Sequence, residues 1–277
     1  MLKTDRLIVL LLIAAAIGFP LGAAAQGKTD QVRVEYAKPE NPAHEPLVEL
    51  LKQKKFHESL RTFLSPFKLP RRVTFKMVGC GGELNAAYDS DDRTIEVCYD
   101  YLAFMQQLSK KVPAKYGISE EAVLTGAAFD LLLHEFGHAV FDVLKIPLLG
   151  REEDAADFFS AYIMLQFAPK DAYALIASTA YVGASEAMAE SKPPSLLAYA
   201  RVHSLPEQRY FNLLCLAYGA DAKTFKATLT LGKLPADRAE GCADEYKQVQ
   251  FAFQRLIAPH VDEKLARQIR ARKWFNF

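Results

Sequence analysis

The chain has 277 residues, 51% of them hydrophobic, and its 34 basic and 33 acidic side chains give a formal net charge of +1. This balance excludes the strongly basic proteins that bind nucleic acid or an anionic membrane surface through charge alone. The length is sufficient for one large domain or for two lobes that share a core.

The first 25 residues are typical of a signal peptide. Lys3 and Arg6 form a basic start, residues 7–17 are apolar, and alanines at 23–25 supply a small-residue cleavage site. Two glycines and a proline interrupt the apolar run, which disfavours the alternative of a membrane anchor, since a spanning helix needs about 20 apolar residues. We expect a periplasmic or secreted protein with no stable membrane insertion after cleavage. Without this segment, which holds two basic residues and one acidic residue, 32 of each remain.

Export changes the interpretation of the four cysteines, because an even number in an oxidising compartment favours two disulfides. By proximity in the sequence we pair Cys80 with Cys98 and Cys215 with Cys242, which is one of three connectivities. Free thiols are the alternative. Neither pair has the C-x-x-C spacing of a structural zinc site or a thioredoxin-like redox site. The loop that the first pair closes would stabilise the fold by about 3 kcal/mol.

A flexible segment and then a packing helix are predicted after the signal peptide. Residues 26–46 are polar with scattered prolines, which predicts a flexible lead-in, and residues 47–277 are expected to form a single domain. Over residues 47–64 the apolar side chains recur at helical spacing, which predicts one amphipathic helix that packs on the core. His57 in this helix is expected at the surface and not in a metal site.

A group of short strands is predicted next. Residues 72–78 alternate between apolar and polar side chains, and residues 84–88 and 94–99 flank an aspartate-rich turn. The pattern predicts a small antiparallel sheet whose ends the first disulfide ties together. A short helix is expected over residues 100–110.

The motif His-Glu-x-x-His lies in a strongly apolar helical stretch at residues 131–140. His134 and His138 are four residues apart and share one helix face, so both imidazoles can reach one tetrahedral metal ion, for which nitrogen ligands favour Zn²⁺. Glu135 projects about 100° around the helix. It would lie beside the metal, where a carboxylate can take a proton from an activated water. The alternative is a pair of core histidines, although such buried polar groups still need partners.

A second helix is predicted over residues 151–162, and it carries an acidic motif. Glu153 follows the second histidine by 15 residues, which is enough chain to lay this helix against the first and to supply a third ligand. Asp157 is one turn further on the same face, where it can accept the free N–H of a ligand histidine. The alternatives are Glu152 or Asp154 as the ligand, or an acidic first turn that only complements the helix dipole.

These two motifs together resemble the gluzincin zinc metallopeptidases, which carry His-Glu-x-x-His on one helix and Glu-x-x-x-Asp on the next. From about Val73 to the C-terminus the chain more closely resembles a bacterial family of putative metallopeptidases of unknown function. The resemblance implies that both histidines and Glu153 bind zinc and that Glu135 is the catalytic base. The segments that match are Cys80-Gly81, residues 85–89, residues 95–99, the helix of His134, residues 150–157 and residues 203–209.

Two further roles are implied by the resemblance alone. Gluzincins have an edge strand above the metal that pairs with the substrate backbone. Residues 82–88 are the candidate, with Asn85 as a substrate contact, and an ordinary internal strand is the alternative. Gluzincins also place a histidine or tyrosine over the open metal position, where it donates to the oxyanion. His203 or Arg209 could take this role; a loop histidine held by a local hydrogen bond is the alternative.

The remaining helices are predicted from their caps and composition. Ser119 is expected to cap the metal-binding helix, and Gly137 inside that helix indicates close packing, because glycine is about 1 kcal/mol less favourable there than alanine. Residues 171–189 are expected to be helical, and a capping box at residues 204–207 is expected to start another helix. Residues 242–277 are expected to form a helix whose aromatic end docks on the core.

The sequence therefore predicts a mostly helical α+β, zincin-like domain that uses Zn²⁺ to hydrolyse a peptide or protein substrate. The chief alternative is an inactive zinc-binding protein of the same fold that serves as a scaffold or binds peptides. A third is a metal-dependent hydrolase that acts on a non-peptide amide. No feature of the sequence indicates an oligomeric state.

Overall fold

The computed structural model describes residues 31–189 and 194–274. The predicted signal peptide and the last three residues lie outside this range. The strands are β1 (Val32–Tyr36), β2 (Val73–Val78), β3 (Ala86–Asp89) and β4 (Thr94–Cys98). The helices are α1 (Glu45–Gln53), α2 (Phe56–Leu64), α3 (Tyr99–Ser109), α4 (Glu120–Leu144), α5 (Glu152–Met164), α6 (Pro169–Ala189), α7 (Pro206–Ala220), α8 (Ala227–Thr230), α9 (Ala236–Glu240), α10 (Cys242–Leu256) and α11 (Glu263–Arg270).

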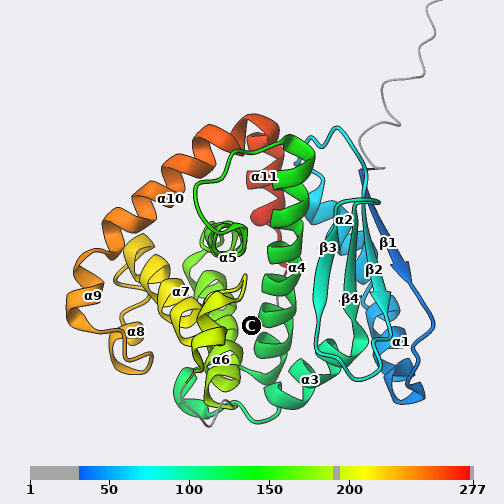
Figure 1. Cartoon of the computed structure of the whole chain (residues 1–277), viewed down its shortest axis with the longest axis horizontal. Coiled ribbons are helices and arrows are strands. Elements are labelled where there is room, and N and C mark those ends of the chain that lie inside the picture. The colour runs from blue at the N-terminus through cyan, green and yellow to red at the C-terminus, as the bar shows by residue number, and fades with distance from the viewer. Residues whose placement is uncertain (1–30, 190–193, 275–277) are drawn as a thin grey trace, which may run out of the picture.

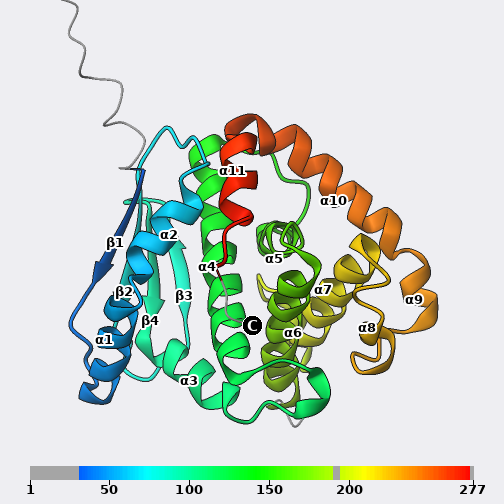
Figure 2. The same cartoon turned by 180° about the vertical axis from the view of Figure 1, so that it is seen from behind.

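Helix α4 is the centre of the molecule. It lies between the sheet on one side and α5, α6 and α7 on the other, in both views of the chain (Figures 1 and 2). Thirteen of its residues are buried, as expected for a helix that is covered on most of its faces. The predicted cap is present, because the Ser119 hydroxyl accepts a hydrogen bond from the amide of Ala122 at 3.1 Å. The mostly helical α+β class is confirmed.

The sheet is mixed, so the prediction of a small antiparallel sheet was wrong. Its order is β1-β2-β4-β3; β1 and β4 both run parallel to β2, and only β3 and β4 are antiparallel. One face is apolar: Phe75 is fully buried on β2 and its ring lies 6.2 Å from that of Phe136 on α4. The other face carries an exposed ion pair between Lys76 and Glu96. The sheet is therefore held to α4 by one face.

The predicted flexible lead-in instead contributes β1 and the start of α1. Val32 pairs in register with Val73, and the parallel pairing requires a crossover, which α1 and α2 provide. These two helices also correct the prediction of a single helix over residues 47–64. Lys55 has a left-handed backbone with φ of 52° between them. The helical repeat of apolar residues is interrupted there, because Phe56 follows Leu51 by five residues. The turn at Lys55 changes the direction of the chain, so that the apolar faces of both α1 and α2 pack on the core.

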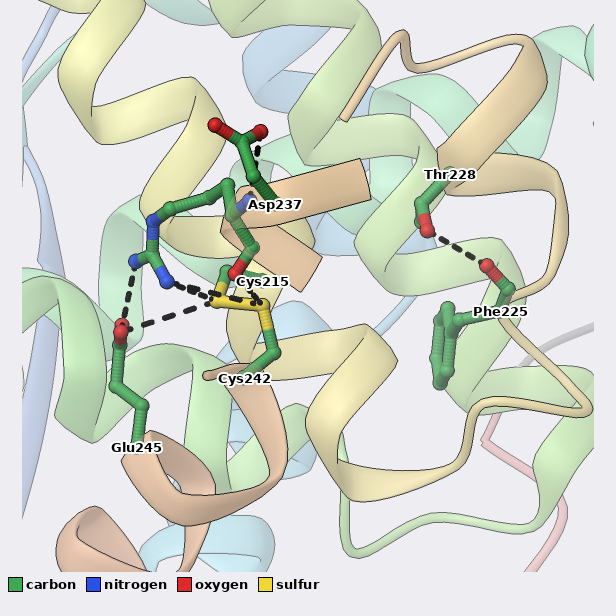
Figure 3. Close-up of a disulfide and its surroundings, with 7 residues drawn as sticks. Cys215, Phe225, Thr228, Asp237, Cys242 and Glu245 are labelled. Carbon is green, nitrogen blue, oxygen red and sulfur yellow. Dashed lines mark hydrogen bonds and ion pairs between the residues drawn. A yellow bond between two sulfur atoms is a disulfide. The ribbon is translucent and has the colours of Figure 1, made fainter. Parts of the chain in front are cut away.

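Both predicted disulfides are present. Cys80–Cys98 ties the loop after β2 to the end of β4, and Cys215–Cys242 joins α7 to α10. Figure 3 shows the second bond, beside which Arg238 forms a 2.7 Å ion pair with Glu245. In the described residues, no helix combines the length and the apolar character that crossing a membrane requires.

The C-terminal region differs from the single helix that the sequence predicts, since α10 and α11 are separate. The docking of the tail is observed for Trp274, whose indole N–H donates to the Ile269 carbonyl at 2.6 Å and whose ring packs edge-on against Phe63. The capping box predicted at residues 204–207 was wrong by one residue. The N-cap is Leu205, helix α7 begins at Pro206, and the Gln208 side chain accepts from the amide of Leu205 at 3.1 Å.

Candidate metal centre

The two motif helices pack closely because one of them carries a glycine at the contact. A Cβ atom at Gly137 would lie 3.2 Å from the ring of Phe159 and 3.4 Å from the Cα of Ala156. This confirms the close packing that was predicted at Gly137. The connection between the helices turns back at Lys145 and Gly150, whose φ angles are 53° and 121°. The first turn of α5 is thereby placed beside the histidines of α4.

Three side chains converge at this contact. The Nε2 atoms of His134 and His138 lie 3.3 Å apart, and Oε2 of Glu153 lies 3.2 Å from the first and 3.4 Å from the second. Around a tetrahedral zinc ion with bonds of about 2.0–2.1 Å, two ligand atoms lie about 3.3 Å apart. The donor triangle therefore has the size and the chemistry that fit zinc. These atoms belong to the His/His/Glu group that could hold a metal ion.

The neighbouring acids of α5 point elsewhere. Glu152 accepts a hydrogen bond from Nδ1 of His138 at 2.8 Å, and Asp154 accepts one from the Ser204 hydroxyl at 2.7 Å. Of the three acidic residues that the sequence offers, Glu153 is the one whose carboxylate meets both Nε2 atoms. Glu152 was considered only as an alternative ligand. Its contact with His138 was not predicted, because a one-residue difference in helix position is hard to resolve from sequence.

Asp157 lies behind His134, in the position that the sequence predicts for it. Its Oδ1 is 2.8 Å from Nδ1 of His134, and Arg209 donates to both of its oxygens at 2.7 Å. Burial raises the pKa of Asp157, but the hydrogen bonds from Arg209 and His134 lower it to about 2. The carboxylate is thus ionised and only accepts. The Nδ1 proton of His134 therefore points at Asp157, which leaves Nε2 as the ring nitrogen that faces the centre and would bind a metal ion.

Glu135 is buried beside the triangle and not part of it. Its Oε1 lies 4.0 Å from Nε2 of His134, and the residue is only 5% exposed. Burial raises the pKa of Glu135, while the nearby His134 and His138 act in the opposite direction. A carboxylate with raised proton affinity at this position is suited to accept a proton from a group held at the triangle.

The sequence model of a protein family described as putative metallopeptidase matches residues 36–257. The chain belongs to this family. No curated protein and no solved structure matches the chain. The resemblance inferred from the motifs is therefore confirmed at the level of this family of putative metallopeptidases, and the zincin-like character of the fold stays a prediction.

A cleft of about 390 Å³ opens from the metal centre of this family member. Its walls come from α3, α4, α5, α6, α7 and the start of β3, and both His134 and Glu135 line it. Asn85, the predicted substrate contact, lines the cleft from the position immediately before β3. The predicted catalytic group and the predicted substrate contact thus face the same space.

Strand β3 is at the edge of the sheet, as the resemblance implies. The amide of Cys98 donates to the Asn85 carbonyl at 3.1 Å. Because hydrogen-bonded and non-hydrogen-bonded pairs alternate along an antiparallel ladder, the backbone groups of Ala86 and Tyr88 face away from β4. An extended chain could pair with these groups.

His203 lies in the loop before α7 and contacts the metal centre from the solvent side. Its Nε2 is 2.8 Å from Oε2 of Glu153, its ring stacks at 6.3 Å on that of His134, and its side chain is 48% exposed. It lies outside the compact His/His/Glu group. Arg209, the other candidate for an oxyanion donor, is bound to Asp157.

Several polar groups deeper in the cleft were not predicted from the sequence. Glu186 accepts a hydrogen bond from the Tyr101 hydroxyl at 2.9 Å, and Asp130 accepts one from Ser160 at 2.6 Å. Tyr101, Asp130 and Glu186 line the cleft, and Ser160 lies behind Asp130. They come from α3, α4, α5 and α6, so only the tertiary packing brings them together.

Proposed function

We propose that the protein is an exported, zinc-dependent peptidase that hydrolyses peptide bonds. The observation that carries this proposal is the triangle of two imidazole nitrogens and one carboxylate oxygen beside the buried Glu135, at the end of a cleft. Three protein ligands and a free fourth position are the arrangement of hydrolytic zinc sites, in contrast to closed structural sites. Membership of the metallopeptidase family supports the same reaction class.

Zinc is the metal that this donor set favours. Two neutral imidazoles and a carboxylate at tetrahedral spacing suit Zn²⁺ better than Mg²⁺ or Ca²⁺, which prefer shells of oxygen ligands. When bound, Zn²⁺ would polarise a substrate carbonyl and lower the pKa of a water molecule. Proton transfer and stabilisation of the oxyanion are assigned to side chains of the protein.

Glu135 is the proposed general base. It would accept the proton of the attacking water and then deliver it to the amine that leaves, so that one carboxylate serves both halves of the reaction. Its burial, and the resulting raised pKa, favour this role because a carboxyl group at its ordinary pKa would return the proton less readily. His203 is proposed to donate a hydrogen bond to the oxyanion after releasing Glu153.

The substrate is proposed to be an extended peptide. The outward-facing backbone groups of Ala86 and Tyr88 would add it to the sheet as a further strand, and the Asn85 side chain would contact it from the wall of the cleft. The two disulfides, and the absence of a membrane-spanning helix from the described residues, are compatible with an exported protein, and the predicted signal peptide is the basis for proposing export.

Replacement of Glu135 by glutamine tests this proposal. The zinc-loaded protein is incubated with a mixture of peptides and the products are identified by mass spectrometry. We expect the wild-type protein to cleave peptides and the Glu135→Gln protein to bind zinc in a 1:1 ratio without cleaving. Glu245→Gln is a matched control, because this half-buried glutamate pairs with Arg238 away from the centre.

Each other outcome has a distinct meaning. A wild-type protein that binds no zinc overturns the metal site. A zinc-loaded protein that cleaves no peptide supports the alternative of an inactive scaffold or peptide-binding protein. Cleavage that survives Glu135→Gln assigns the base to another residue.

A further inference from the structure

Arg209 lies outside the two motif helices and is joined to the metal centre through Asp157. It lies in the first turn of α7 and donates from Nε to Oδ2 and from Nη2 to Oδ1 of Asp157, both at 2.7 Å. The second of these oxygens also accepts from Nδ1 of His134. A continuous chain of hydrogen bonds thus runs from α7 through α5 to a proposed zinc ligand on α4.

We propose that Arg209 is a positioning residue, which fixes the carboxylate plane of Asp157 and thereby the orientation and tautomer of His134 for binding zinc. This inference rests on the proposed metal site but not on peptide cleavage. A carboxylate held by one imidazole alone can rotate about its last torsion angle, which is broad. Two parallel bonds from a guanidinium remove that freedom and leave one lone pair of Oδ1 directed at His134.

The orientation of the Asp157 carboxylate matters because it determines which nitrogen of His134 faces the metal. A freely rotating Asp157 could release Nδ1 of His134, and the ring could then carry its proton on Nε2, where a metal ion cannot bind. Hydrogen-bond partners of ligand histidines typically change metal affinity by about 10–100-fold when they are removed. Arg209 stabilises such a partner, so part of that effect is expected to depend on it.

Helix α7 is placed firmly enough to serve this role. Just before it, the Ser204 hydroxyl donates to Asp154 on α5 at 2.7 Å. Further along, Cys215 and its neighbour Leu216 are fully buried, and the disulfide to Cys242 fixes the helix to α10. The guanidinium therefore projects from an anchored helix and not from a mobile loop.

The test measures the dissociation constant for Zn²⁺ by competition with a chelating dye, with the whole exported chain. We expect Asp157→Ala to weaken binding by about 10–100-fold, Arg209→Ala by about 10-fold, and Arg209→Lys by an intermediate amount, since lysine restores the charge without the two parallel bonds. In the Asp157→Ala background, Arg209→Ala is expected to change the constant by less than about 2-fold, because the two residues act through one contact.

Arg238→Ala is the matched control. Arg238 and Glu245 form a 2.7 Å ion pair whose side chains are 33% and 28% exposed, against 36% and 26% for Arg209 and Asp157 at the same distance. Its loss should lower the melting temperature without weakening zinc binding. Equal losses of zinc affinity in Arg209→Ala and Arg238→Ala would overturn the positioning role and indicate a general effect on folding. A full effect of Arg209→Ala in the Asp157→Ala background would overturn it too.

A second measurement needs no bound metal. Exchange of the Nδ1 proton of His134 with solvent is followed by NMR in the metal-free protein, where this proton faces Asp157. We expect slow exchange in the wild-type protein and in Arg238→Ala, and faster exchange in Arg209→Ala, where the Asp157 carboxylate is free to rotate. Unchanged slow exchange in Arg209→Ala contradicts the proposal. If the wild-type protein binds no zinc, the metal site fails, and this measurement still decides whether Arg209 positions His134.

Discussion

The hydroxyl of Tyr88 on β3 donates a hydrogen bond of 2.8 Å to Oδ2 of Asp142 on α4. This contact joins the edge strand directly to the helix that carries the metal centre. The position of the edge strand relative to the centre therefore depends on one side-chain hydrogen bond as well as on its ladder with β4.

Replacing Tyr88 by phenylalanine is expected to loosen this strand. Loss of one half-buried hydrogen bond should lower the free energy of unfolding by about 1 kcal/mol. If β3 holds the substrate backbone, KM for peptides should rise while kcat changes little. Tyr173→Phe is the control, because it removes a similar hydrogen bond, to the Tyr116 carbonyl at 3.1 Å, away from β3. An unchanged KM in Tyr88→Phe would argue against strand addition.

Asp130 is expected to make stability depend on pH. Burial raises its pKa from 3.8 to about 6, although the hydrogen bond from Ser160 opposes this. The folded state thus binds the proton more tightly than the unfolded state, and stability falls as pH rises from about 4 to about 6. Asp130→Asn removes the ionisation and keeps an oxygen for Ser160. Urea unfolding of the metal-free protein measures the free energy of unfolding at pH 4 and pH 8. We expect Asp130→Asn to raise this free energy, relative to the wild-type protein, more at pH 8 than at pH 4. The same difference at pH 4 and pH 8 contradicts this prediction.

The disulfide between Cys215 and Cys242 closes 27 residues, so its removal in a Cys215→Ala/Cys242→Ala protein should lower the free energy of unfolding by about 3–4 kcal/mol. The corresponding change at Cys80 and Cys98, which close 18 residues, should lower it by about 3 kcal/mol. Denaturant unfolding measures both. Because α7 carries Arg209, only removal of the Cys215–Cys242 bond is expected to weaken zinc binding as well. Equal zinc affinities in the two variants would separate the disulfide from the metal centre.

Two glycines in helices should respond to alanine in opposite directions. A Cβ at Gly126 would lie 2.7 Å from the Cβ of the fully buried Ser178, whereas at Gly183 no atom lies within 4 Å. Alanine is favoured over glycine in a helix by about 1 kcal/mol, but overpacking a core contact costs about 1–3 kcal/mol. We expect Gly183→Ala to raise the melting temperature and Gly126→Ala to lower it. A stabilised Gly126→Ala protein would show that α4 and α6 separate easily.

The candidate metal centre was largely predictable because its signals are local. The two histidines are related by one helical turn, and Glu153 and Asp157 by another, so spacing placed each pair on one helix face, and the resemblance favoured Glu153 over its acidic neighbours. The disulfides were also found from neighbourhood in the chain. By contrast, Arg209 lies 52 residues from Asp157, and nothing in its surroundings in the sequence indicates that partner.

The sheet was predicted less well because its order depends on distant pairings. β1 has only five residues, too few for alternation to stand out among the prolines and charges around it. The parallel pairing of β2 with β4 places β3 at the edge, and this depends on how both strands pack against α4. Local patterns specify that a segment is a strand, but they do not specify its neighbours.

The matched family region, residues 36–257, begins at the last residue of β1 and ends before α11. A protein shortened to those limits would lack both elements. The backbone of β2 would keep β4 but lose β1, and its freed side would become an open edge, which readily recruits strands from other molecules. The face of α2 that α11 covers would also be uncovered. We expect such a truncated protein to aggregate, so expression should start upstream of Val32 and extend beyond Trp274.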